Sequence, residues 1–179
     1  MSRFALPLAL AIGALATPAH ADEVFGGVYA HAVETPFTFD TAEGGVDAQV
    51  GWRSEPIEGL DFLGKPSAQA FGSVNSWGDT SFVAAGLSWK IDVGGRVYVR
   101  PGIGLAVHDA PETRVNAATG LRTDLGSRVL FEPEIALGTR LSERVSVEAS
   151  WVHISNAQIF DSEQNPGIDM VGLRLNWRM

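Results

Sequence analysis

Apolar residues recur at every second position through most of this chain, and that alternation restricts it to β structure. Between residues 129 and 137 the odd-numbered positions are all apolar, whereas the even-numbered ones include Glu132 and Glu134. Side chains of a strand point alternately to its two faces, so this period gives each strand one apolar and one polar face. The pattern predicts an all-β fold with eight antiparallel strands at residues 23–33, 45–53, 67–75, 80–91, 96–107, 127–141, 144–155 and 168–178.

The polar faces of these strands distinguish between two all-β architectures. A soluble sandwich or periplasmic lipid-binding barrel turns its apolar face inward, whereas a membrane barrel turns it to lipid and fills its lumen with polar and small residues. One strand here carries Arg96 and Arg100 beside Gly102 and Gly104, which suits a narrow lumen of ion pairs. We therefore predict an eight-stranded transmembrane β-barrel. We expect the carboxylates of the lumen to form ion pairs and not a catalytic pair. These ion pairs would join Glu132, Glu134 and Glu148 to Arg96, Arg100, Arg140 and Arg174.

The connections between the predicted strands indicate an orientation. Short links at 92–95 and 142–143 alternate with long links at 108–126 and 156–167. Bacterial barrels have short periplasmic turns and long extracellular loops, so the long links are expected outside the cell. The link at 54–66 is longer than this rule predicts. Tryptophans near the strand ends, on the apolar phase, match the aromatic girdles of such barrels: Trp52, Trp89, Trp151 and Trp177.

The N-terminal segment has the form of a secretory signal. Arg3 supplies a positive charge, residues 4–16 are apolar, and Ala19-His20-Ala21 is a small-residue cleavage site. The apolar run is shorter than the roughly 20 residues that a membrane helix needs, which argues against a retained anchor. We therefore predict a cleaved signal peptide at residues 1–21 and a single barrel domain at 22–179.

Composition argues against several classes of function. The chain has no cysteine, so an exported form would be stabilised by its core, a metal or a closed sheet. Its formal net charge of −8 argues against a nucleic acid as partner. No spacing of potential ligands predicts a metal site, and no cofactor is expected. His31 and His108 have no partners by spacing and are expected to be loop or rim residues.

A histidine, a serine and an aspartate lie on the apolar phase of the last two predicted strands. His153 and Ser155 follow Trp151 at steps of two residues, and Asp169 shares the phase of the apolar residues that follow it. All three are therefore expected on the lipid-facing side, at the outer rim. Serine becomes a nucleophile when a base accepts its proton, histidine is suited to that exchange, and an acid orients the imidazole. The arrangement predicts a Ser-His-Asp triad for ester hydrolysis.

The motifs around these residues resemble one protein family. His153-Ile154-Ser155-Asn156-Ala157 and then Asn165-Pro166-Gly167-Ile168-Asp169, at the end of an eight-stranded barrel, are similar to the outer-membrane lipid A 3-O-deacylase (PagL-like) family. The resemblance implies hydrolysis of an ester-linked acyl chain of lipid A, or of a related outer-leaflet glycolipid, in the bacterial outer membrane. It puts the base on His153 and the nucleophile on Ser155. The motif positions near the site are Asn156, Asn165 and Gly167.

Backbone N–H groups of Asn156 or Gly167, together with the Asn156 side chain, are the expected oxyanion donors. The chain departs from the family pattern at the acid, which is usually glutamate, whereas Asp169 is one methylene shorter. The loop between the motifs is also longer than the family spacing, and it contains Glu163 as a substitute acid. The alternative function is a non-catalytic small outer-membrane barrel of structural or adhesive type. With either function, the protein is expected to be a monomer or a homodimer.

Overall fold

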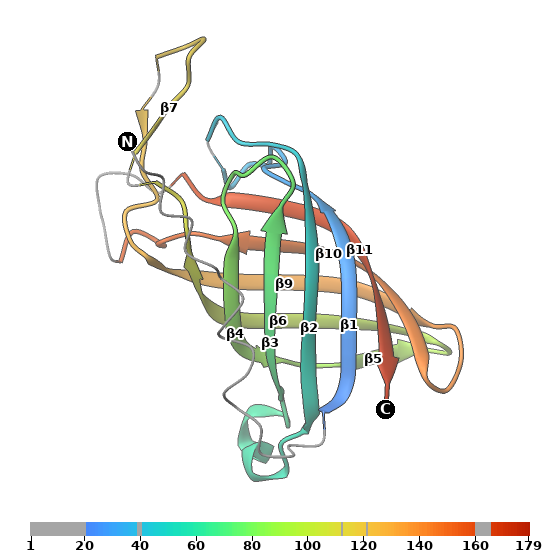
Figure 1. Cartoon of the computed structure of the whole chain (residues 1–179). Helices are drawn as coiled ribbons and strands as arrows, with labels where there is room; N and C mark the ends of the chain where they lie inside the picture. Colours follow the sequence, from blue (N-terminus) through green and yellow to red (C-terminus); the bar gives the residue numbers. More distant parts are fainter. Residues whose placement is uncertain (1–20, 39–40, 112, 121, 160–165) are drawn as a thin grey trace.

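The structure, a computed structural model, is a barrel of long antiparallel strands (Figure 1). It describes residues 21–38, 41–111, 113–120, 122–159 and 166–179, so all of the predicted signal peptide except Ala21 lies outside the described residues. The barrel strands are β1 (Ala21–Ala30), β2 (Val46–Pro56), β3 (Ser67–Asn75), β4 (Phe82–Ser88), β5 (Ile91–Gly94), β6 (Val97–His108), β9 (Val129–Arg140), β10 (Val145–Ile154) and β11 (Ile168–Arg178).

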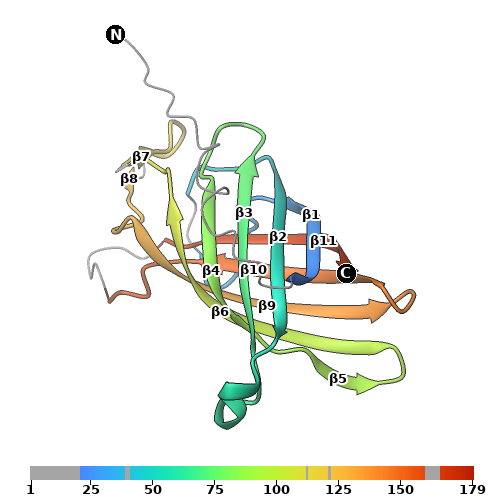
Figure 2. The same ribbon diagram turned by 60° about the horizontal axis from the view of Figure 1, so that its bottom comes forward.

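The sheet closes on itself through a pairing between β4 and β6. The strand order is β4-β3-β2-β1-β11-β10-β9-β6, and β4 pairs with β6 to complete the circle (Figure 2). β5 continues β4 past a break at Trp89 and Lys90 and pairs with the start of β6, so β4 and β5 together make one barrel strand. The predicted eight-stranded antiparallel barrel is thereby confirmed. Whereas β5 pairs with β6 alone, closure pairs each of the other barrel strands on both sides, as a sheet surrounded by lipid requires.

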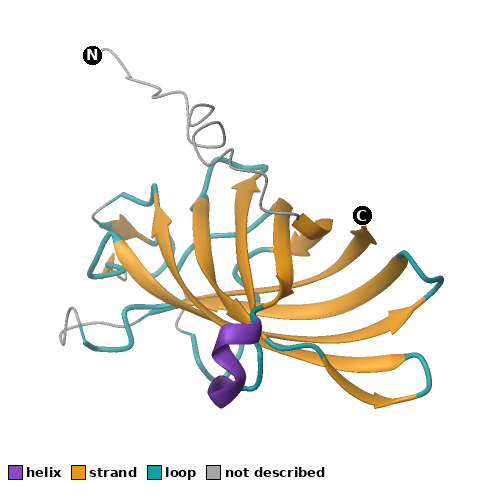
Figure 3. Cartoon of the chain, turned by 90° about the horizontal axis from the view of Figure 1, so that it is seen from below, coloured by secondary structure: helices purple, strands orange, loops and turns teal. Residues whose placement is uncertain are grey.

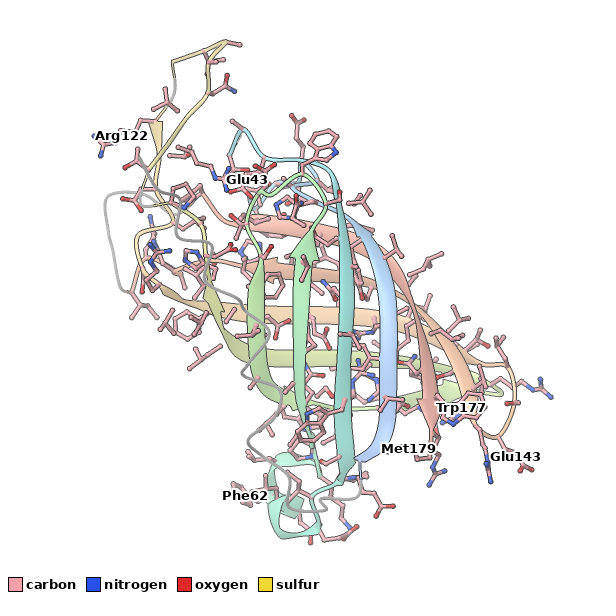
Figure 4. All side chains as sticks on the ribbon, viewed as in Figure 1. Glu43, Phe62, Arg122, Glu143, Trp177 and Met179 are labelled. Atoms are coloured by element: carbon pink, nitrogen blue, oxygen red, sulfur yellow. The ribbon has the colours of Figure 1, made fainter. Side chains whose placement is uncertain are left out.

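The two ends of the barrel differ in their connections. At one end, called the loop end here, links join β1 to β2, β3 to β4, β6 to β9 and β10 to β11. The link from β6 to β9 carries a small hairpin of β7 (Arg114–Val115) and β8 (Arg122–Thr123), which projects beyond the barrel in Figure 1. The opposite end, called the turn end, holds the C-terminus. Figure 4 labels Glu43 at the loop end and both Phe62 and Glu143 at the turn end.

The long link at the turn end contains a short helix that the sequence pattern does not predict. Glu58–Leu63 form the 3₁₀ helix η2, which ends at Gly64 with φ at +79°, a conformation that glycine adopts without strain. Trp89 fastens this link to the barrel, because its Nε1 donates a hydrogen bond to the Leu63 carbonyl at 2.7 Å. Figure 3 shows η2 standing away from the barrel wall. Among the described residues, no helix is long and apolar enough to cross a membrane.

The strands present their apolar face outward, as the alternation predicts. On β11 the buried Arg174 and Asn176 alternate with apolar side chains that are about half exposed: Val171, Leu173, Leu175 and Trp177. Figure 4 labels Trp177 on the outside, near the turn end. An apolar exterior over a polar interior is the arrangement of a membrane barrel and the reverse of a soluble one. The soluble alternative is therefore wrong.

Ion pairs fill the interior toward the turn end. Arg174 is buried on β11, where its Nη1 donates to Glu134 at 2.9 Å and its Nε donates to Glu148. Arg100 on β6 donates to Glu148 at 2.9 Å from the opposite side. The expected lumen pairing of these four residues is confirmed. Each charge of the network is desolvated, and its partner is what makes burial tolerable.

Other members of the predicted ionic set lie elsewhere. Arg140 pairs with Asp92 at the turn end, and Arg96 is exposed beside it, so neither joins the buried pairs. Glu132 is buried, and neither of its carboxylate oxygens has a hydrogen-bond partner in the described part of the chain. The sequence pattern does not predict that Arg53 belongs to the lumen ion pairs. In the structure, Arg53 Nη1 donates to Glu23 at 2.6 Å. Alternation assigns a charge to the lumen but does not say which strand across the lumen supplies its partner.

Toward the loop end the interior contains an apolar cluster beside buried polar groups such as Asp47 and Glu132, which adds to the expected polar and small residues. The inward positions of β10 change from Glu148 and Ser150 to Val152 and Ile154 as the strand approaches the loops. These side chains join one buried cluster made of Phe25, Tyr29, Phe71, Phe82, Ala84, Ala106, Ala110, Leu125, Leu130, Val152, Ile154, Ile168 and Met170. This cluster packs against the inner side of the strand ends. The outer faces of the same strand ends carry the predicted triad.

His31 and His108, which lack partners by spacing, both have them in the structure. His31 hydrogen-bonds to Asp47 through Nδ1 and to Glu43 through Nε2, both at 2.8 Å. Burial alone would lower the pKa of His31, but the hydrogen bonds and charges of the two carboxylates outweigh it and raise the pKa to about 9. His108 Nε2 donates to the Ser127 carbonyl at 2.7 Å. Both histidines therefore fasten loop-end segments.

We expect the His31 imidazole to titrate near pH 9 in NMR spectra of the protein in detergent micelles. Its folded pKa exceeds the ordinary value of 6.5, so its stabilising contribution is full below pH 6.5, declines above it, and is lost once the pH passes about 9. Amide exchange in the β1–β2 loop, corrected for its intrinsic rate, should rise over that range. His31→Gln should already exchange fast at about pH 6. An ordinary titration midpoint for His31 would contradict the assignment.

Candidate active site

His153 and Asp169 stand directly opposite each other on β10 and β11. The strand register pairs their Cα atoms, and His153 Nδ1 lies 2.7 Å from Asp169 Oδ1. Both residues continue the outward phase of their strands, which Trp151 and Val171 also follow. The structure thus brings the predicted base and acid together on the outer face. An aspartate, although shorter than glutamate, reaches the imidazole because the two strands pair at this level.

The Asp169 carboxylate also accepts hydrogen bonds from two residues outside the predicted set. Trp151 Nε1 donates to Oδ1 at 2.8 Å, and Thr35 Oγ1 donates to Oδ2. Asp169 is completely buried beneath these groups. The two-residue step from Trp151 to His153 places both side chains on one face of the strand, and this is the sequence signal that indicates a role beyond the aromatic girdle. Thr35 lies in an irregular loop, where no sequence period points to Asp169.

Ser155 lies one residue beyond β10 and is held in place by β9. Its N–H donates to the Phe131 carbonyl at 3.1 Å, and the Phe131 N–H donates back at 2.8 Å. This bridge extends the strand alternation, which puts Ser155 on the same phase as His153. The two residues are 6% and 8% exposed, so a substrate would meet them at the rim of a covered site. Within the described residues, no hydrogen bond joins Ser155 to His153.

Asn156 is buried and binds neighbouring segments of the chain. Its Nδ2 donates to the Leu125 carbonyl at 3.1 Å, and its Oδ1 accepts from the Gln158 N–H at 2.6 Å. These bonds fix the start of the link between β10 and β11. Asn165 and Glu163, in the same link, lie outside the described residues.

Gly167 packs against the imidazole of His153. A Cβ at this position would lie 2.7 Å from Cε1 of the ring, and the φ angle is +60°. Both the lack of space and the left-handed backbone therefore require glycine here. Beside it, a cavity of about 90 Å³ lies between Gly167, Asp169 and the β1–β2 loop. A larger cavity of about 240 Å³ lies at the turn end, lined by Lys90 and Arg144 among others, and includes none of the triad residues.

The arrangement at the loop end is suited to proton transfer by an imidazole. Hydrogen bonding of His153 Nδ1 to a carboxylate holds the ring and leaves Nε2 for exchange with a hydroxyl group. In the part of the chain that the structure describes, no group of three or more histidine, cysteine, aspartate or glutamate side chains could hold a metal ion.

Comparisons with known proteins identify the sequence family and the fold of this chain. The family model described as "Lipid A 3-O-deacylase (PagL)" matches residues 40–178. No curated protein matches the chain in sequence. The solved structure titled "Crystal structure of the outer membrane enzyme PagL" superposes with a TM-score of 0.58 at 17% identity, covering 88% of this chain and 99% of that one.

Other solved structures share the barrel alone. Neisserial surface protein A (NspA) superposes with a TM-score of 0.56 at 7% identity, covering 88% of this chain and 96% of its own. A de novo designed transmembrane β-barrel gives a TM-score of 0.52 at 9% identity, with coverage of 88% and 96%. At such identities, structural likeness establishes the fold and leaves function to the sequence family and the site.

Proposed function

This chain belongs to the lipid A 3-O-deacylase (PagL) family, and we therefore propose that it removes an ester-linked acyl chain from lipid A or a related outer-leaflet glycolipid. Its family and its barrel fold place it in the bacterial outer membrane. We assign Ser155 as the nucleophile, His153 as the general base and acid, and Asp169 as the group that orients the imidazole.

The position of the hydrogen-bonded His153–Asp169 pair carries this proposal. The pair is on the outer face of the barrel wall, covered by the β1–β2 loop, at the loop end of a lipid-facing column of apolar side chains on β10 and β11. Acyl chains of a membrane lipid would lie along that column, so their ester groups would approach the height of the pair. A triad in this place would meet lipids of the outer leaflet, because it faces away from the lumen.

The hydrogen bonding assigns a role to each imidazole nitrogen. Nδ1 of His153 binds Asp169, so Nε2 accepts the Ser155 proton as Oγ attacks the ester carbonyl carbon. The imidazolium then protonates the departing sugar oxygen, which leaves an acyl group on the serine. Water attacks this acyl carbon, with Nε2 again taking the proton, and the fatty acid departs as serine is restored. We expect the bond between Ser155 and Nε2 to form when substrate binds.

The negative oxygen of the tetrahedral intermediate needs hydrogen-bond donors. The Asn156 amide is engaged with Leu125 and Gln158, which supports a role in holding the loop. Gly167 lies beside the imidazole, so we assign its backbone N–H as an oxyanion donor. Asn165 remains a proposed site residue on its motif position alone.

Mass spectrometry of lipid A tests the proposed reaction. Purified protein in detergent should release a free fatty acid and lower the lipid A mass by one acyl chain.

Asp169→Asn should lose most of this activity, whereas Glu163→Gln should retain it, and the reverse pattern would transfer the acid role to Glu163. No release by folded protein, together with no labelling of Ser155 by a serine-directed phosphonate, would favour the structural or adhesive barrel.

Gly167→Ala should slow deacylation by about 100-fold, because an added methyl group would displace the imidazole and misalign its Nε2. The measurement is kcat for acyl release, with heat-modifiable gel migration confirming a folded barrel. Gly120→Ala is the matched control, because Gly120 also has a positive φ, at +69°, but a Cβ there would meet nothing within 4 Å. Equal losses in both variants would attribute the effect to backbone strain alone.

A further inference from the structure

We propose that Trp151 and Thr35 are positioning residues that together fix the Asp169 carboxylate for catalysis. The inference rests on the proposed function, because it assigns the two residues a role in that reaction. Neither residue touches the reacting atoms in this scheme. Both act through Asp169 on the orientation of the His153 imidazole, and Trp151 also contacts that ring directly.

Trp151 contacts both members of the base–acid pair. Its indole N–H donates to Asp169 Oδ1 at 2.8 Å, the same oxygen that His153 Nδ1 approaches at 2.7 Å. Its ring stacks on the imidazole, with centroids 5.7 Å apart and planes inclined by 29°. Residues two apart on a strand lie on one face, which allows one side chain to provide both contacts. Trp151 therefore restrains the imidazole plane and one carboxylate oxygen at once.

Thr35 fixes the other carboxylate oxygen from a distant segment. Its hydroxyl donates to Asp169 Oδ2 and accepts the Phe37 N–H at 3.1 Å, so both its donor and an acceptor site are used. The same loop is attached by the Val33 N–H, which donates to the Asp169 carbonyl at 2.9 Å. The Phe37 ring lies 6.0 Å from that of Trp151, which closes the loop over the site.

The three donors determine the plane of the carboxylate. A carboxylate held at one oxygen can still rotate about its Cβ–Cγ bond, since that torsion is broad. Donors at Oδ1 and Oδ2 remove this freedom and also stabilise the charged form. A fixed carboxylate holds the imidazole so that Nε2 keeps one direction. Supporting groups of this kind make an active site precise to a fraction of an ångström.

Two conservative variants remove the donors and keep most of each side chain. Trp151→Phe keeps an aromatic ring beside His153, and Thr35→Val keeps the shape of threonine. Each should lower kcat by about 10- to 100-fold, the range for a lost hydrogen bond to a charged group, with little change in KM. Thr35→Ser keeps the hydroxyl that Thr35→Val removes, so this variant should retain most of the activity. Trp177→Phe and Thr139→Val, on the outer phase near the turn end, are matched controls and should retain full activity.

The pH profile separates positioning from packing. Loss of a donor makes the charged form of the Asp169 carboxylate less stable, so the carboxylate holds the imidazole proton more strongly. The acidic limb of the kcat–pH profile should therefore move to higher pH in both variants. Among the described residues, the ionisable groups around Asp169 are His153 on β10 and, across the 90 Å³ cavity, Glu34 and Glu43 of the β1–β2 loop. Neither variant changes these groups. An unmoved limb, with activity lost equally at every pH, would overturn the inference.

A readout independent of activity keeps the inference separate from the proposed function. The Nδ1 proton of His153, followed by NMR in micelles, should resonate at low field in the unaltered protein because it is shared with a carboxylate. Its signal should shift or broaden in Trp151→Phe and in Thr35→Val and return in Thr35→Ser. If the unaltered protein releases no acyl chain, the proposed function fails. An unchanged signal in both variants would overturn the positioning role, whatever the activity.

Discussion

Ser155→Ala and His153→Asn should each reduce acyl release from lipid A by about 10⁴-fold or more, the scale seen when one member of a triad is removed. Without the hydroxyl there is no nucleophile, and without the imidazole no group can accept its proton. The measurement is single-turnover release of fatty acid, followed by mass spectrometry. Combining the two substitutions should cost little more than either alone, because nucleophile and base act as one unit.

Both variants should fold, because His153 and Ser155 lie outside the charged interior. Heat-modifiable migration and a β-type circular dichroism spectrum should therefore match those of the unaltered protein. Ser142→Ala is the matched control, since Ser142 lies in the exposed turn between β9 and β10. Near-normal activity in either active-site variant would show that the triad is wrongly assigned. Loss in Ser142→Ala would point to a general defect of the preparation.

Arg174→Met should strongly destabilise the barrel. It removes the donor that Glu134 and Glu148 share and leaves a buried carboxylate without its closest cation. Breaking a buried pair in this way typically costs about 3–5 kcal/mol. Glu134 is the more affected of the two, because Glu148 keeps its bond to Arg100. The free energy of unfolding in urea, measured in lipid vesicles, reports the loss.

A second substitution identifies the cause of that loss. Arg174→Met combined with Glu134→Gln should recover part of the stability, because the unpaired charge is gone. Arg144→Met, at an exposed arginine on the turn between β9 and β10, should stay within about 0.5 kcal/mol of the unaltered protein. If the double variant is as unstable as the single one, packing of the Arg174 side chain, and not its charge, accounts for the effect.

Alternation predicted the strands well where a strand has lipid on one side and the lumen on the other. β3 (Ser67–Asn75) and β11 (Ile168–Arg178) have the predicted bounds, because turn residues flank an unbroken period. The strand expected at 80–91 is instead divided at Trp89, whose side chain binds the link that contains η2. That contact joins segments far apart in the chain, and no local period encodes it.

The candidate site could be predicted in part for the same reason. His153 and Asp169 were recognisable because their phase on neighbouring strands follows from counting by two, and the register then makes them face each other. Thr35 was not recognisable, because it approaches from an irregular loop after β1. The buried pairing of His31 was missed likewise, since Glu43 lies in a loop whose path the sequence does not reveal.

The origin of the groups around Asp169 has a consequence for the order in which the protein matures. Its partner His153 is 16 residues away in the same hairpin, whereas its partner Thr35 is 134 residues away. A hairpin closes a short loop and forms early, but Thr35 arrives only when β1 joins β11, a contact of long sequence separation. A chain whose barrel is still open thus has its base and acid in contact while the carboxylate remains free to rotate. On the proposed mechanism, the carboxylate is held at both oxygens only after β1 has paired with β11 and the barrel has closed.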